Sequence, residues 1–171
     1  MLEVSTLELL AEVSIALAGF SGIALILGRR SSGRRSGLDN RRLSFLLELT
    51  LGVFFLSVIP LVANAASVPH QLNLRVCTTA MLTFNAVLGV LMYFRDARLS
   101  EQDRSRLVRP SQRIIQALLG LLSVCWVVVI LGALEQFAMS IYLAGLTVML
   151  LAAAFQFYHL LRAVGETDDA T

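Results

Sequence analysis

Five apolar segments of membrane-spanning length make up most of this chain of 171 residues. Each holds roughly 20 to 25 residues, and about 20 apolar residues in an α-helix cross the hydrocarbon core of a bilayer. The chain is 57% apolar and only 15% charged, whereas soluble domains average about 45–50% and about 25%. The sequence therefore predicts an all-α integral membrane protein, a single transmembrane domain built as a bundle of five helices. We place these helices at residues 7–27, 44–68, 75–94, 114–134 and 139–161.

The basic residues predict which way the chain faces. All 14 are arginines, and 13 of them lie in the loops 28–43 and 95–113 or after the last segment, at Arg162. Only Arg75 lies elsewhere. Arg-rich loops stay on the cytoplasmic side, so we expect the N-terminus outside and the C-terminus inside, with an acidic cytoplasmic tail over 162–171. The first segment lacks a basic n-region, so we interpret it as a retained span and not as a secretory signal.

The arginine clusters have a sufficient explanation in topology, and binding of anionic lipid headgroups is compatible with it. Nucleic-acid binding is not expected, because neither loop interleaves aromatic residues with the arginines. An all-arginine complement fits GC-rich coding, and we predict a multi-pass protein of a bacterial cytoplasmic membrane. The candidate headgroup and topology residues of the first loop are Arg29, Arg30, Arg34, Arg35, Arg41 and Arg42.

Small residues recur along one side of the first segment, where helices in a bilayer pack closely. The bulky side chains of Leu9, Val13 and Phe20 lie on the opposite side, at about 100° per residue. We therefore predict that the first helix packs into a bundle through its small side. The residues of this side are Ala11, Ser14, Ala18, Ser21 and the adjacent Gly22.

Two carboxylates also lie within the first segment. Glu8 and Glu12 are one turn apart and share a face with Gly19, at the border of the small side. An ionisable residue in a span is by default a functional hypothesis, here a proton carrier or a site for a cation. Alternatively, both residues lie near the external interface, where they reach water or pair with Arg75.

Amides in the second and third segments are the other candidates for a polar path. Asn64 continues a line of hydroxyl side chains at Thr50 and Ser57, and Asn85 lies near the middle of the third segment. Hydrogen bonds between helices explain such residues without a transport function. If Glu12, Asn64 and Asn85 converge, they line a narrow polar path.

Several other polar or unusual residues have structural explanations. Pro60 removes one backbone hydrogen bond and should bend the second helix. Glu48 is expected to pair with Arg41 seven residues earlier. His159 is expected to anchor the last helix at the cytoplasmic interface, and Trp126 to pack within its bundle.

The sequence offers no catalytic or metal-binding pattern. Cys77 and Cys125 lie in apolar segments and are expected to be buried thiols, and the spacing of the cysteines and histidines suits no metal. We therefore expect no cofactor and no enzymatic activity. Ala11-Glu12-Val13 resembles the essential glutamate of the small multidrug resistance transporters, but only over these few residues. Those proteins have four spans, and many insert in both orientations, which the strong arginine bias opposes here.

Two functions remain open. The first is a structural or accessory subunit of a membrane complex or homo-oligomer, which packs through the small side of the first helix. The alternative is a homo-oligomeric channel or proton-coupled transporter that uses Glu12. The expected partners are membrane lipid and either a second copy or a larger complex.

Overall fold

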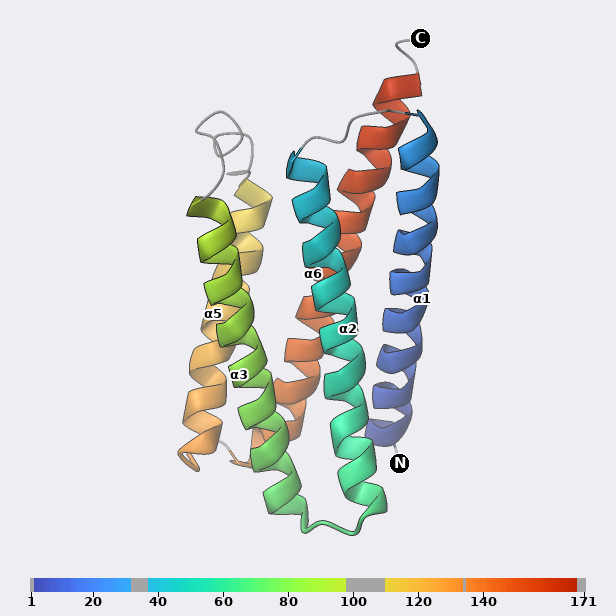
Figure 1. Cartoon of the computed structure of the whole chain (residues 1–171). Coiled ribbons are helices and arrows are strands. Elements are labelled where there is room, and N and C mark those ends of the chain that lie inside the picture. Colours follow the sequence, from blue (N-terminus) through green and yellow to red (C-terminus); the bar gives the residue numbers. More distant parts are fainter. Residues whose placement is uncertain (1, 32–36, 98–109, 134, 169–171) are drawn as a thin grey trace. The chain divides into compact units, whose positions relative to one another are not determined.

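The computed structural model describes residues 2–31, 37–97, 110–133 and 135–168, which form five long α-helices and no strand (Figure 1). The all-helical prediction is confirmed. Among the described residues, four of the helices contain a stretch that is long and apolar enough to cross a membrane, whereas the stretch found in α5 is shorter, Ala117–Ile130. The helices are α1 (Leu2–Ser31), α2 (Gly37–Ala65), α3 (His70–Ala97), α5 (Pro110–Ile130) and α6 (Ala138–Asp168), with a 3-10 turn, η1 (Glu135–Phe137), before α6.

The end of α2 is a Schellman turn centred on Ser67. Ser67 has a positive φ of 56°, and its N–H donates to the Asn64 carbonyl at 3.0 Å while the N–H of Val68 donates to Ala63 at 3.0 Å. This pair of bonds satisfies the last helical carbonyls. Because the turn is this tight, α3 already begins at His70. The helix thus begins five residues before the predicted start of the third span at residue 75.

A second Schellman turn ends α5. Gly132 has a φ of 88°, and the N–H groups of Gly132 and Ala133 donate to Val129 at 2.9 Å and to Val128 at 3.2 Å. Glycine takes this conformation without the steric penalty of a Cβ atom. Helix α5 therefore ends at Ile130, before the predicted boundary at residue 134, although the sequence stays apolar beyond it.

The chain divides into two compact units, residues 1–55 with 149–171 and residues 56–148, and each is described by itself. The first unit holds α1, the first part of α2 and the last part of α6, with a core that includes Leu46 and Leu49. In the second unit α3 and α5 pack along each other (Figure 1). Its core includes Met81, Trp126 and Tyr142.

Large apolar side chains are also exposed along every long helix. Examples are Phe20 on α1, Phe55 on α2, Val90 on α3, Leu121 on α5 and Leu151 on α6, all at least half exposed. Soluble proteins rarely expose continuous apolar surface of this kind. An exterior of this kind suits hydrocarbon as the surrounding solvent, and with the four long apolar helices it is typical of a membrane protein.

Candidate functional site

The two sides of α1 differ in burial as well as in side-chain size. Ala11, Ser14 and Ser21 are buried within the chain itself. Ala18 and Gly22 are partly buried. The hydroxyls of both serines donate to carbonyls of α1, Ser14 to Ala11 at 2.8 Å and Ser21 to Leu17 at 2.6 Å. With their hydrogen bonds made locally, these small residues present a compact surface to the interior of the chain.

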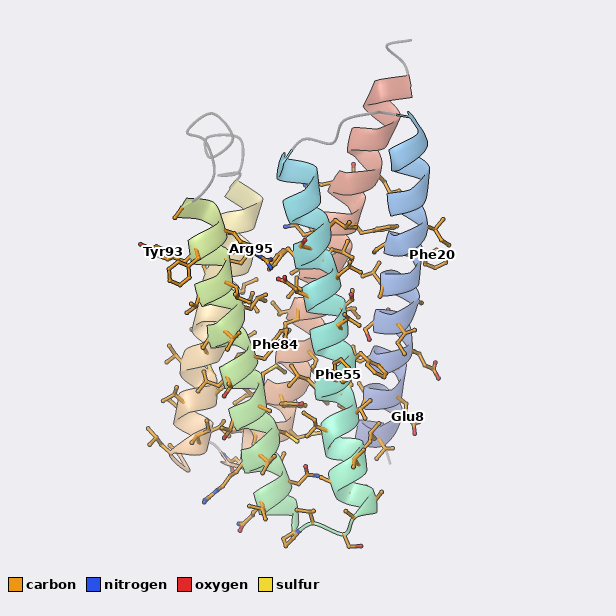
Figure 2. All side chains as sticks on the ribbon, viewed as in Figure 1. Glu8, Phe20, Phe55, Phe84, Tyr93 and Arg95 are labelled. Atoms are coloured by element: carbon orange, nitrogen blue, oxygen red, sulfur yellow. The ribbon has the colours of Figure 1, made fainter. Side chains whose placement is uncertain are left out.

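The carboxylates of α1 lie on its exposed side. Both Glu8 and Glu12 are exposed, and Figure 2 shows Glu8 and Phe20 projecting from the helix surface. Glu12 is eight residues inside the apolar stretch that begins at Val4, which is roughly 12 Å at 1.5 Å per residue. Within the described part of the chain, the Glu12 carboxylate has no hydrogen-bond or ion-pair partner. Its environment is therefore set by whatever surrounds α1.

Asn85 forms a hydrogen bond between two helices. Its Nδ2 donates to Ser123 Oγ on α5 at 2.6 Å. The Ser123 hydroxyl in turn donates to the Leu119 carbonyl at 2.8 Å. The amide of Asn85 thus joins α3 to α5, which is the structural role that interhelical polar residues commonly have.

Asn64 lies far along the helical hairpin from Asn85. It is exposed and one residue from the end of α2, whereas Asn85 is 15 residues into α3. Those 15 residues span roughly 22 Å of helix. The structure thus does not bring these two amides of the second unit together.

The hydroxyl line that precedes Asn64 on α2 is buried. Thr50 and Ser57 are fully buried, and Thr50 Oγ1 donates within its own helix to Leu46 at 3.0 Å. For the Ser57 hydroxyl, no hydrogen-bond partner is found among the described residues. These hydroxyl side chains thus lie on the buried face of α2.

One hydrogen bond near Pro60 was not expected from the sequence. Because proline has no N–H, the carbonyl of Leu56, four residues earlier, lacks its helical partner. The hydroxyl of Tyr142 on α6 donates to this carbonyl at 2.6 Å, and Tyr142 is fully buried. A side chain from another helix thus replaces the donor that Pro60 removes. The only sequence signal for this hydrogen bond was Pro60. A proline within a helix indicates that a backbone carbonyl lacks its donor, but not which side chain supplies one.

Asn73 extends this polar contact to the start of α3. Its Nδ2 donates to the Pro60 carbonyl at 3.3 Å, and its Oδ1 accepts from the thiol of Cys77 at 3.1 Å. Each group in this chain of contacts has its partner, and Tyr142 and Asn73 tie two different helices to α2 near Pro60. These contacts connect α6 and α3 to α2 at the carbonyls of Leu56 and Pro60.

Gly145 allows a close approach of α5 and α6. A Cβ atom at this position would overlap the ring of Trp126 at Cζ2, and would lie 3.2 Å from Trp126 Cε2 and 3.4 Å from Met81 Cε. Trp126 is fully buried, so its ring has no room to withdraw. Packing of a large ring against a glycine is the way these helices meet.

The residues predicted to lie at the cytoplasmic side are described only in part. Arg34 and Arg35 lie outside the described residues, and the side chains of Arg29, Arg30, Arg41 and Arg42 do as well, so the predicted pair of Arg41 with Glu48 is not described. His159 packs edge-on against Phe155, with ring centroids 4.4 Å apart, and against Tyr158 at 5.6 Å.

The described residues hold no cluster that would suit a metal ion. Among them, no group of three or more His, Cys, Asp or Glu side chains comes together. Cys77 and Cys125 are both free thiols. Comparison with protein-family models, with curated proteins and with solved structures finds no match to this chain. The exposed carboxylates of α1 are therefore the feature from which a function is best argued.

Proposed function

We propose that this chain is a multi-pass protein of a bacterial cytoplasmic membrane that acts as a non-catalytic subunit of a homo-oligomer or larger membrane complex. In this proposal all five long helices cross the bilayer, α5 included. The N-terminus lies outside, and the arginine-rich segments lie in the cytoplasm against anionic headgroups. The number and length of the apolar helices support the membrane location, and the distribution of arginines supports the orientation.

The single observation that carries the subunit role is the position of Glu12. Its carboxylate is exposed on a helix that is apolar on either side of it, and no described residue pairs with it. Lipid tails cannot solvate a carboxylate, and a charge at this depth costs about 2.5 kcal/mol or more. A second polypeptide that covers Glu12 with a hydrogen-bond donor removes this cost.

The docking surface is the exposed side of α1 and not its small side. Ser14 and Ser21 are already buried by their own chain, so they are not available to a partner. Glu12, Ala16 and Gly19 are exposed, and a Cβ atom on Gly19 would meet nothing within 4 Å. This open, low-relief surface leaves room for another helix to approach.

The test is the mass of the particle in a native-lipid nanodisc, measured by native mass spectrometry. We expect more than one chain per particle, and a single chain for Glu12→Arg with unchanged helical content. The control is Phe20→Leu, which alters the lipid-facing side of α1 without adding a charge. It should leave the mass of the particle unchanged. A wild-type particle that holds one chain and no other protein contradicts the proposal.

A homo-oligomeric channel or proton-coupled transporter is the second candidate, and the same exposed carboxylate favours it. An ionisable group with no partner in its own chain can exchange a proton during transport. Asn85 does not support this candidate, since its amide is engaged by Ser123. Transport predicts a pH-dependent flux in proteoliposomes that Glu12→Gln abolishes, and an unchanged flux in that variant removes Glu12 from the mechanism.

A further inference from the structure

Two exposed strips of the same spacing lie on α1 and α3. The acidic strip of α1 consists of Glu8, Glu12, Ala16 and Gly19, and the basic strip of α3 consists of Arg75, Thr79, Thr83 and Ala86. All eight residues are exposed. In both strips the intervals are four, four and three residues, which places each strip along one face of its helix.

The two strips have complementary charges at the same end. The acidic strip begins with two carboxylates. The basic strip begins with Arg75, the one arginine that lies neither in the two arginine-rich loops nor after the last apolar segment. Towards the other end both strips carry small residues, which permit close approach of two helices in a bilayer.

The threonine hydroxyls of the basic strip need no hydrogen-bond partner from another helix. Thr79 Oγ1 donates to the Arg75 carbonyl at 2.7 Å, and Thr83 Oγ1 donates to the Thr79 carbonyl at 2.8 Å. Their hydroxyls are therefore satisfied within α3, and their outer surface is small and largely apolar. Arg75, at one end of the basic strip, is what distinguishes this strip from the rest of the lipid-facing exterior.

The charged ends of the two strips lie at equal depth along their helices. Glu8 is four residues from Val4, where the apolar stretch of α1 begins, and Arg75 is four residues from Gln71, where that of α3 begins. Successive membrane-spanning helices alternate in direction, so the first and third spans run the same way. In the proposed topology α1 and α3 are therefore parallel. Parallel packing of the two strips thus places Arg75 level with Glu8 and one turn from Glu12.

We propose that the acidic strip of one copy of this chain packs on the basic strip of a second copy, with Arg75 of the second copy bonding the carboxylates of Glu8 and Glu12. This inference rests on the proposed subunit function and names the partner. Arg75 also interacts within its own chain, but a guanidinium has five N–H donors and serves two partners. Because the two surfaces differ, the contact is head-to-tail, and copies joined in this way form a ring if the rotation between them closes.

Charge reversal in mixed copies tests the contact. Glu12→Arg alone and Arg75→Glu alone should each weaken association by more than about a hundredfold, because like charges opposed across an interface are strongly unfavourable. Co-expression of the two variants with different tags should restore association, since each altered strip then meets its complement on the other copy. Glu12→Gln, which removes the charge without reversing it, should have a smaller effect than Glu12→Arg.

The mixture also distinguishes contact between copies from pairing within one chain. If Glu12 and Arg75 pair within the chain, only the double variant Glu12→Arg/Arg75→Glu recovers and the mixture does not, which overturns the proposal. If Glu12→Arg abolishes association and Arg75→Glu leaves it unchanged, the proposed contact with Arg75 is wrong while the subunit function stands. If the wild-type particle holds a single chain and no other protein, both proposals fail.

Cysteine cross-linking tests the register, in a background in which Cys77 and Cys125 are replaced by alanine. Ala16 and Thr83 occupy the third position of their strips, so chains carrying Ala16→Cys mixed with chains carrying Thr83→Cys should form a disulfide-linked dimer that contains both tags. Neither variant should cross-link by itself. Cross-linking between two Ala16→Cys chains would show that α1 of one copy contacts α1 of another, which would overturn the proposal. Cross-linking of Phe20→Cys chains with Thr83→Cys chains, where Ala16→Cys chains do not cross-link, would overturn it as well.

Discussion

Replacement of Tyr142 by phenylalanine isolates one buried hydrogen bond of the second unit. The hydroxyl of Tyr142 donates to the Leu56 carbonyl at 2.6 Å, and that carbonyl has no helical donor because residue 60 is proline. Phenylalanine keeps the ring and its packing, so the substitution removes the hydroxyl and little else. Leu56 is then left with a buried acceptor that neither its own helix nor α6 satisfies.

The expected loss in the free energy of unfolding is about 1–2 kcal/mol. Hydrogen bonds between helices in a bilayer contribute about 0.6 kcal/mol on average and at most about 1.7 kcal/mol. Leaving a buried acceptor unsatisfied costs about 1–3 kcal/mol. The Tyr142 side chain is 1% exposed, so water does not replace the lost donor and the effect should exceed the average.

A double-mutant cycle with Pro60→Ala tests this reasoning. Alanine at position 60 restores an N–H to the Leu56 carbonyl, so Tyr142→Phe should then cost less than about 0.5 kcal/mol. Stability is measured by equilibrium unfolding in mixed detergent micelles, and the difference between the two backgrounds gives the coupling energy of Tyr142 with Pro60. An equal cost of Tyr142→Phe in both backgrounds would refute the view that the hydroxyl replaces the donor missing at proline.

Two further pairs of substitutions probe the same unit by the same unfolding measurement. Gly145→Ala should lower stability by about 1–3 kcal/mol through overpacking against Trp126, whereas Gly120→Ala, whose Cβ would meet nothing within 4 Å, should be neutral or stabilising; equal effects would contradict the proposed close approach. Asn85→Ala should cost about 0.6–1.7 kcal/mol, because Ser123 keeps its own acceptor. Ser123→Ala should cost more because it leaves the partly buried Asn85 amide without this acceptor.

Much of the fold was predictable because apolar length and the spacing of residues along a helix are properties of the sequence alone. The apolar segments indicated helices, and the alternation of small and bulky residues separated the buried Ser14 and Ser21 of α1 from the exposed Phe20. The helix ends were less predictable. Ser67 takes a positive φ, a conformation that nothing in a serine indicates beforehand.

The sequence by itself determined the helical class, the apolar exterior and the lengthwise positions of the charged residues, since each depends on one helix at a time. Only the tertiary structure decided that Asn85 meets Ser123, 38 residues away, that Tyr142 serves the carbonyl left free by Pro60, and that Gly145 receives the ring of Trp126. Periodicity shows which residues share a face, but the rotation and register of one helix against another decide which faces meet. Those depend on the packing of all the side chains at once.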